Sequence, residues 1–358
     1  MASTVSVHPA SGTSRLRAWL WGGLLVVFAG PLAVGSAVAA EPTVATSPAG
    51  AASVPQARSV DAWLARMRDA SAGRAYQGTF VVSSASGALS RALITHACDG
   101  EQQWVRVETL TGASRTTYRH DDEVVTFWPG ARVVRSEKRE TLAAFPVFMQ
   151  AHGGAIADFY RAQLTSSGRV AGLDADVIEF VPRDGFRYGY RAWSEKSTGL
   201  LLKLQTLDAA GRVLEQSAFS ELQLNAPVST DSLKTAMGRT DGYRVEPAAV
   251  TPTTADAEGW LIKTAVPGYQ PLHCYRWAGS SASTVHWVFS DGLASVSLFI
   301  DVYDPRHHVA EAVMLTGATR TLTRRLGKPG GGRWWLTVVG EAPTRTLQAF
   351  ADGLVRNR

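Results

Sequence analysis

The clearest pattern of apolar and polar positions lies between Arg169 and Leu222, where short extended runs alternate with turn signals. Within these runs apolar residues recur at every second position, as on a strand with one buried face. The turn signals at 183–185, 196–199 and 208–211 are short enough to pair neighbouring runs directly. The pattern therefore predicts a four-stranded antiparallel meander in a curved sheet with one solvated face. The residues expected to share faces are Ile178 with Phe180, Tyr188 with Tyr190, and Leu200 with Leu202 and Leu204.

A helix and further strands are predicted before this segment. Ser59 is a good N-cap for a helix whose apolar residues fall at positions 60, 63, 64 and 67. Aromatic residues cluster without alternation in Leu142–Leu164, which we expect to form one or two helices covering the sheet. With the meander this makes about ten or eleven strands, the number at which open antiparallel sheets curl into half-barrels. The early strands are expected at Tyr76–Val82, Arg91–Ala97, Trp104–Leu110, Ser114–Arg119, Glu123–Trp128 and Ala131–Glu137.

A second domain is predicted after a linker. Residues 226–259 are rich in Pro, Ser, Thr, Ala and Gly with little periodicity, and 250–254 is expected to be their loosest part. A terminal helix is expected to begin at Pro343, with Leu347, Phe350, Ala351 and Leu354 as its buried stripe. The strands of this domain are expected at Trp260–Thr264, Leu272–Trp277, Thr284–Ser290, Ala294–Tyr303, Ala312–Thr316, Thr319–Arg325 and Trp334–Val339. The predicted fold class is α+β, mainly antiparallel β.

Length and charge agree with an exported two-domain protein. The 358 residues exceed what one core usually organises, and a net charge of +5 is too small to indicate nucleic acid. Arg15 and Arg17 precede an apolar run and a small-residue cleavage site, which predicts a signal peptide over 1–40; an uncleaved anchor is the alternative. The composition of 41–58 predicts a disordered segment.

Export places both cysteines, Cys98 and Cys274, in a compartment where disulfides form. On the expected boundaries they lie in different domains, so a bridge would lock the domains together. The alternative is that each is a small buried apolar residue, which we favour. Spacing alone leaves both open.

No set of catalytic residues is found in the sequence, and neither an enzyme nor a cofactor is predicted. The usual nucleophile, zinc-protease, redox and phosphate-loop motifs are missing. His307 and His308 are adjacent, so on a strand they would point to opposite faces, and a solvated loop is preferred over a metal site. His273 next to Cys274 lacks an orienting third group.

Two groups of residues are candidates for binding. A strongly curved sheet of this size can enclose more volume than its own side chains fill, so an aromatic cover could close over a fatty ligand or complete a dry core. Clustered positive charge could meet anionic headgroups or an acidic peptide, or could serve solubility alone. The lipid candidates are Phe145, Phe148, Phe159 and Tyr160, and the headgroup or partner candidates are Arg320, Arg324, Arg325 and Arg333.

Several long motifs resemble the RseB/MucB family. They include P-R-D-x-x-R-Y-G-Y-R-x-W at Pro182–Trp193 and F-S-D-G-L-A-S-V-S at Phe289–Ser297. Others are Y-Q-G-T-F-V at Tyr76–Val81, T-G-L-L-L-K at Thr198–Lys203 and V-V-G-E-A-P at Val338–Pro343. The resemblance extends over nearly the whole chain after the leader, from Ala62 to Leu354.

The resemblance implies a periplasmic regulator of an envelope-stress sigma factor. It implies a LolA/LolB-like half-barrel over 59–225 that senses lipid, and a domain over 260–358 that binds the periplasmic part of an RseA/MucA-type anti-sigma factor. Binding would shield this partner from regulated proteolysis, and lipopolysaccharide or another acylated ligand would release it. The alternatives are a LolA-type carrier of lipids or lipoproteins and, less favoured, an exported hydrolase. The oligomeric state is left open and includes a homo-oligomer.

Overall fold

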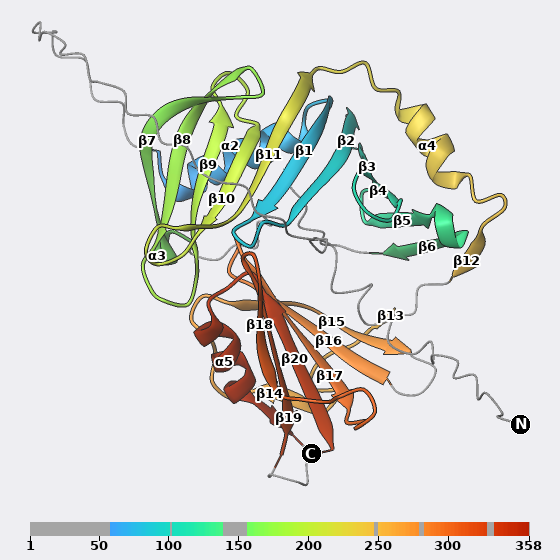
Figure 1. Ribbon diagram of the computed structural model, residues 1–358, viewed down its shortest axis with the longest axis vertical. Coiled ribbons are helices and arrows are strands. Elements are labelled where there is room, and N and C mark those ends of the chain that lie inside the picture. Colours follow the sequence, from blue (N-terminus) through green and yellow to red (C-terminus); the bar gives the residue numbers. More distant parts are fainter. Residues whose placement is uncertain are drawn as a thin grey trace, which may run out of the picture.

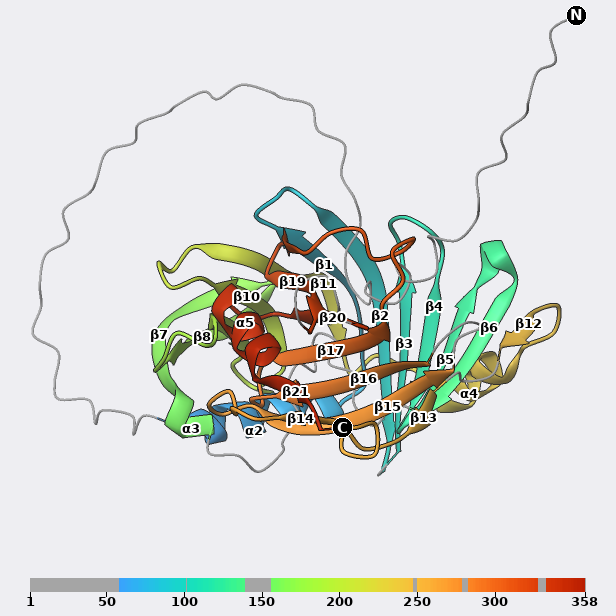
Figure 2. The same ribbon diagram turned by 90° about the horizontal axis from the view of Figure 1, so that it is seen from below.

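The protein consists of two β-sheet domains, one above the other in Figure 1. The computed structural model describes residues 58–100, 102–138, 156–246, 250–278, 283–327 and 333–357. The predicted leader and the segment after it therefore lie outside the described residues. Seen from below, the larger sheet curves in an arc from β7 at one edge to β12 at the other (Figure 2).

The larger sheet has twelve strands among the described residues, in the order β12-β6-β5-β4-β3-β2-β1-β11-β10-β9-β8-β7. All neighbours pair antiparallel except β12, which runs parallel to β6. Consecutive strands are neighbours throughout β1–β6 and β7–β11, and β1 pairs with β11 to join the two meanders. The strands are β1 (Tyr76–Ser84), β2 (Leu89–Asp99), β3 (Gln102–Thr109), β4 (Thr116–His120), β5 (Glu123–Trp128), β6 (Val133–Lys138), β7 (Tyr160–Val170), β8 (Leu173–Pro182), β9 (Gly189–Glu195), β10 (Leu201–Leu207), β11 (Val213–Leu224) and β12 (Arg244–Glu246), with a 3-10 turn η1 (Pro129–Ala131) before β6.

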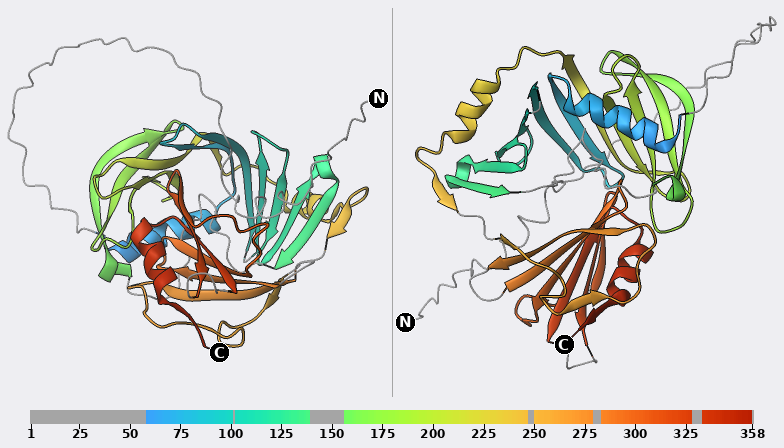
Figure 3. Two further views of the ribbon diagram at one scale, coloured as in Figure 1. Left: turned by 60° about the horizontal axis from the view of Figure 1, so that its bottom comes forward. Right: turned by 180° about the vertical axis from the view of Figure 1, so that it is seen from behind.

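The predicted first helix is confirmed as α2 (Val60–Ala72). The Ser59 side chain accepts a hydrogen bond from the backbone N–H of Ala62, which satisfies one of the free donors at the helix start. Trp63 and Met67 on its buried stripe pack against strands of the β7–β10 part of the sheet. Figure 3 shows α2 crossing these strands.

The expected meander is present as β8–β11, and β11 keeps exposed positions, but β9 and β10 lack the expected solvated face. Leu200, Leu201 and Leu202 are all fully buried, although neighbours on an extended chain point to opposite faces. Leu201 packs in one apolar cluster with α2, whereas Leu200 and Leu202 belong to another with Tyr76. The alternation of apolar residues predicted that one face of this strand is buried. In the structure the second face is buried too, because the sheet curls and α2 covers it.

The expectation of helices over Leu142–Leu164 holds for Ile156–Phe159 and is wrong from Tyr160 onwards. Residues 142–155 lie outside the described residues, and only α3 (Ile156–Phe159) is helical. From Tyr160 onwards the chain forms β7, which pairs with β8 along its whole length. β7 is an edge strand whose side chains are mostly exposed, so its sequence shows no clear alternation of apolar and polar residues. Pairing with β8 decides its structure instead.

The linker is more ordered than its composition indicates. It contains α4 (Thr230–Gly238), β12 and a third element, β13 (Val250–Pro252). α4 packs Leu233 and Met237 against the β2–β6 part of the larger sheet. β13, which lies in the part expected to be loosest, pairs with β15 of the second sheet. Each element gains its order from a sheet that it joins or covers, and local periodicity does not show this.

The second domain follows its predicted strands closely. A seven-stranded sheet runs in the order β13-β15-β16-β17-β20-β19-β18, and α5 (Thr344–Gly353) covers one face. All four residues of the predicted α5 stripe are buried. No helix in the described part of the chain is both long and apolar enough to cross a membrane. The strands are β14 (Trp260–Ile262), β15 (Gln270–Ala278), β16 (Ser283–Ser290), β17 (Ser295–Val302), β18 (Ala312–Thr316), β19 (Thr319–Leu326), β20 (Trp334–Gly340) and β21 (Leu354–Arg356), of which β14 and β21 form a separate pair.

We predict that Leu201→Ala lowers the free energy of unfolding by about 2–5 kcal/mol, because it removes a fully buried side chain and leaves a cavity. Leu164→Ala is the control, since Leu164 is 56% exposed and should change stability by less than about 0.5 kcal/mol. Urea unfolding followed by circular dichroism measures both. Equal effects of the two substitutions would contradict the described burial.

Candidate functional site

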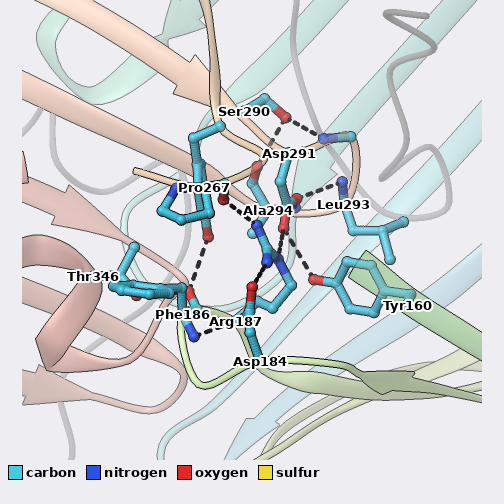
Figure 4. Close-up of polar contacts among 12 residues, drawn as sticks. Tyr160, Asp184, Phe186, Arg187, Pro267, Ser290, Asp291, Leu293, Ala294 and Thr346 are labelled. Carbon is cyan, nitrogen blue, oxygen red and sulfur yellow. Dashed lines mark hydrogen bonds and ion pairs between the residues drawn. The ribbon is translucent and has the colours of Figure 1, made fainter. Parts of the chain in front are cut away.

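The two domains meet where the loop between β8 and β9 contacts the turn between β16 and β17 (Figure 4). We call this contact the interdomain junction and define it by Tyr160, Phe186 and Arg187 of the larger domain and Asp291 and Leu293 of the smaller one. Every one of these residues except the half-buried Phe186 is buried. Its geometry decides how the two sheets are held relative to each other.

The centre of the junction is an ion pair between Arg187 and Asp291. Arg187 Nε donates to Asp291 Oδ2 at 2.9 Å, and both side chains are 0% exposed. Arg187 also donates from Nη2 to the Pro267 carbonyl at 2.6 Å and pairs through Nη1 with Asp184. The guanidinium thus has hydrogen-bond partners on both domains. A buried charge with fewer partners would cost several kcal/mol in lost hydration.

Asp291 is held in place by its own turn. Its Oδ1 accepts hydrogen bonds from the backbone N–H groups of Leu293 and Ala294 at 2.9 and 2.7 Å. Gly292 adopts a φ of +97°, a conformation that side-chain-bearing residues rarely take, so the tight turn favours glycine there. The second oxygen, Oδ2, remains available for Arg187 and for the Tyr160 hydroxyl, which donates at 3.1 Å. The two carboxylate oxygens of Asp291 thus accept four hydrogen bonds.

Burial and charge act in opposite directions on the Arg187 guanidinium. Burial lowers its pKa, but the hydrogen bond and the negative charge of Asp291 outweigh burial and raise the pKa above its ordinary value. Burial, followed by the charge of Asp291, raises the pKa of the Tyr160 hydroxyl well above its usual range. Tyr160 therefore stays a hydrogen-bond donor, and the Arg187 guanidinium stays charged.

Apolar contacts also cross the junction, and they are reciprocal. Leu293 of the smaller domain lies in the apolar cluster of the larger one, beside Ile156 and Tyr160. Phe186 of the larger domain packs against the core of the smaller one. The Phe186 carbonyl accepts a hydrogen bond from the Thr346 hydroxyl at 2.6 Å. Each domain therefore completes part of its core with a side chain of the other.

A second contact between the domains lies at the turn of the β18–β19 hairpin. An added Cβ at Gly317 would lie 2.5 Å from the Glu215 carboxylate and 3.1 Å from Ser84 Cβ, so the turn is close against the larger sheet. Burial and the nearby charge of Glu341 raise the pKa of Glu215 to about 7, against a hydrogen bond from the Ala318 N–H that lowers it. This carboxyl group therefore titrates near neutral pH at a domain contact.

The four lipid candidates are only partly placed. Phe145 and Phe148 lie outside the described residues. Phe159 is half-buried, and its ring lies 4.5 Å from the Arg187 guanidinium carbon, whereas Tyr160 is fully buried in the junction. Phe159 and Tyr160 therefore contact the ion pair. The sequence pattern grouped these aromatic residues but contained nothing to show that two of them adjoin the second domain.

The four candidate arginines do not form one patch. Arg320 is buried, donates to the Gly317 carbonyl at 2.8 Å and lies near the Tyr188 ring of the larger domain. Arg324 pairs with Asp352 at 2.6 Å, and Arg325, on the opposite face of β19, lies over the Tyr303 ring. Arg333 is exposed. Their spacing along the chain suggested a cluster, but Arg320 and Arg324 are engaged within the chain, Arg325 lies on the other face of β19, and Arg333 stands before β20.

The cysteines and histidines have structural surroundings. Cys98 and Cys274 are both free and half-buried, as the unbridged interpretation expected. Burial raises the pKa of the Cys274 thiol to about 12, so it remains protonated. His308 stacks on Trp335, and His307 lies beside Asp304 at 3.0 Å. Within the described ranges no group of three or more His, Cys, Asp or Glu side chains is arranged to hold a metal ion.

Sequence reasoning missed Arg187 and Asp291 as functional candidates, yet both lie in the motifs that carry the family resemblance. Arg187 belongs to the Pro182–Trp193 block and Asp291 to the Phe289–Ser297 block, about a hundred residues away along the chain. The available signal was that one motif contains an arginine and the other an aspartate, so the two could carry opposite charges. Only the fold shows that the two motifs meet.

Comparison with known proteins gives matches over both domains. Residues 59–237 match the family described as the MucB/RseB N-terminal domain, and residues 254–355 match the MucB/RseB C-terminal domain. The sigma factor AlgU regulatory protein MucB of Pseudomonas aeruginosa is 29% identical over 308 residues, covering 83% of this chain and 92% of that protein. The sigma-E factor regulatory protein RseB of Escherichia coli K12 is 22% identical over 82% of this chain and 89% of its own.

A solved structure is also similar along both domains. A crystal structure of MucB in complex with MucA(peri) matches with a TM-score of 0.63 and 26% sequence identity, covering 83% of this chain and 98% of that one. The fold is therefore that of a two-domain, mainly antiparallel β protein, and its relatives are named sigma factor regulatory proteins. The chain belongs to the MucB/RseB family.

We predict that Asp291→Asn lowers the free energy of unfolding by about 3–5 kcal/mol, because it removes the one fully buried counter-charge of Arg187 and leaves only the partly exposed Asp184. Asp352→Asn is the matched control: it also breaks an Asp–Arg pair, but Asp352 is 70% exposed, and the expected loss is below about 1 kcal/mol. Chemical denaturation of both variants is the measurement. A loss at Asp291 no larger than at Asp352 would contradict the central role of the pair.

A second prediction concerns pH. Because the folded-state pKa of Glu215 is raised to about 7, its contribution to stability is complete below the ordinary carboxyl pKa and is lost as the pH rises towards 7. Glu215→Gln should remove this loss, which we expect to be at most about 3 kcal/mol between pH 4.5 and 7.5. Glu221→Gln, an exposed position on the same strand, should keep the wild-type profile. Thermal unfolding at a series of pH values measures these profiles. The same pH dependence of stability in the wild type and in Glu215→Gln would refute the prediction.

Proposed function

We propose that this protein acts in the periplasm as a negative regulator of an envelope-stress sigma factor. It binds the periplasmic domain of a MucA/RseA-type anti-sigma factor and shields that domain from regulated proteolysis. The supporting observation is the likeness to MucB in complex with MucA(peri), which extends across both domains of this chain. The Pseudomonas aeruginosa relative, which this chain matches over 92% of that protein's length, is named a sigma factor regulatory protein.

A lipid signal, such as lipopolysaccharide or another acylated ligand, releases the partner in this proposal. A ligand shifts such an equilibrium only if it binds the partner-free conformation better than the partner-bound one. Phe159, a lipid candidate, contacts the Arg187 guanidinium, and Tyr160, another, donates to Asp291. An acyl chain that moved these rings would act directly on the contact that holds the two domains together. This proximity supports a coupling between lipid and domain arrangement.

The partner contact is proposed to lie on the smaller domain and its junction with the larger one. Of the four candidate arginines, Arg333 is the exposed one and is the best placed to meet a negatively charged group. Arg320 and Arg324 are engaged within the chain, so their replacement would also disturb the fold. Arg333→Ser is therefore the substitution that separates a binding role from a structural one.

We predict that the mature protein co-elutes in size-exclusion chromatography with the periplasmic domain of its anti-sigma partner, and that lipopolysaccharide reduces this co-elution. The protein should also slow cleavage of that domain by a site-specific protease. If Arg333 contacts the partner, Arg333→Ser weakens binding and makes it less sensitive to salt. Asp241→Ser, a charge change on the α4–β12 loop of the larger domain, is the control and should have no effect. Failure of the wild-type protein to co-elute would refute the proposed function.

A further inference from the structure

The smaller domain has an exposed apolar edge strand. β18 is the last strand of the seven-stranded sheet, so within the described residues one of its edges has no neighbouring strand. Val313, Met314 and Leu315 are 41, 52 and 63% exposed, and Val309 just before the strand is 86% exposed. Soluble proteins usually protect such edges with charged residues or proline, and the sequence A-V-M-L-T of β18 contains neither.

Hairpin geometry identifies which backbone groups of β18 are free to pair. The turn has two residues, Gly317 and Ala318, and it is closed by the pair Thr316 and Thr319. In such a hairpin the closing pair is hydrogen-bonded, and the direction of the N–H and C=O groups alternates along the strand. The backbone N–H and C=O groups of Met314 and Thr316 therefore point towards β19. Those of Val313 and Leu315 point outwards from the edge.

The position of Ala312 agrees with this alternation. Its N–H donates to the Thr323 hydroxyl of β19 at 3.1 Å, so the even-numbered residues of the strand do face β19. Val313 and Leu315 also share one side of the sheet, because strand residues two apart point the same way. The edge thus offers the outward N–H and C=O groups of two residues, Val313 and Leu315. The side chains of these two residues are exposed on one side of the sheet, and that of Met314 is exposed on the other.

The edge is held rigidly beside the domain junction. The hairpin turn lies against Ser84 and Glu215 of the larger sheet, and Arg320 at its base is buried. Figure 1 shows the hairpin reaching the lower ends of β1 and β2. Leu89 at the start of β2 and Val213 at the start of β11 are also exposed apolar residues at this end of the larger sheet. A rigid edge loses little conformational entropy when a further strand pairs with it.

The size of the edge decides between two occupants. Five residues span about 17 Å, and pairing over that length buries a few hundred Å² on each side, well below the roughly 800 Å² per partner of a stable interface. A second copy of this chain joined only along β18 would therefore bind weakly. A partner chain that contacts the protein elsewhere as well can add one strand here without depending on it alone.

We propose that β18 accepts an extended segment of the anti-sigma periplasmic domain as an added strand, with alternate apolar side chains packed beside Val313 and Leu315. This inference rests on the proposed function. Backbone pairing supplies affinity in strand addition, and the alternate side chains supply specificity. The added strand would start next to the junction, so a change in domain arrangement would reach it through the β18–β19 turn.

Two variants of one residue test the backbone contact. Leu315→Pro removes an outward N–H that β19 does not use, so the hairpin should keep its pairing, and we expect binding to the anti-sigma periplasmic domain to weaken about tenfold or more. Leu315→Ala keeps the N–H and removes only the side-chain contact, so it should weaken binding clearly less than Leu315→Pro, which removes both. Isothermal titration calorimetry gives the dissociation constants, and thermal unfolding verifies that both variants are folded.

Amide hydrogen exchange of the wild-type protein tests the same inference without a substitution. In the free protein the amides of Val313 and Leu315 should exchange fast and those of Met314 and Thr316 slowly; in the complex Val313 and Leu315 should become protected. Tight binding with no protection of these two amides, or with equal affinity of Leu315→Pro, overturns strand addition and leaves the proposed function standing. No binding by the wild-type protein overturns both. Protection that appears in the free protein and grows with its concentration identifies a second copy as the occupant and also overturns the inference.

Discussion

The buried ion pair between Arg187 and Asp291 is the constraint on which the arrangement of the two domains depends. Both side chains are withdrawn from water, which is costly unless each charge is matched and its hydrogen bonds are satisfied. The protein meets this condition with the turn amides after Asp291, the Tyr160 hydroxyl and the Pro267 carbonyl. Because these groups come from both domains, the pair is satisfied in only one relative placement of the two sheets.

The same condition makes the junction suitable for a switch. Separating the domains would break a strong electrostatic contact and expose Leu293 and Phe186, but it would also return two charges to water. These opposing terms leave a net difference that is small compared with either one. A ligand or a partner with a modest preference for one arrangement can then shift the balance. Glu215 at the second contact adds a group whose charge changes near neutral pH.

Much of the secondary structure could be predicted because it rests on local causes. The cap at Ser59 and the buried stripe after Pro343 each follow from a few neighbouring residues, and both predictions are confirmed. The errors share a different cause. Tyr160–Val170 becomes a strand because β8 lies beside it, and Val250–Pro252 becomes one because of β15. In neither segment do apolar and polar residues alternate clearly enough to predict a strand, and nothing in either sequence identifies the strand it pairs with.

The sequence by itself determined the two-domain β architecture and, through long motifs, the family. Alternation and turn residues act over a few positions and are legible along one chain. Only the tertiary structure decided what the motifs do: it brought Arg187 to Asp291, gave the four candidate arginines different surroundings and left Val313 and Leu315 at an open edge. The physical reason is that ion pairing, burial on both faces of a strand and edge exposure depend on neighbours distant in sequence. No local pattern records which distant residues those neighbours are.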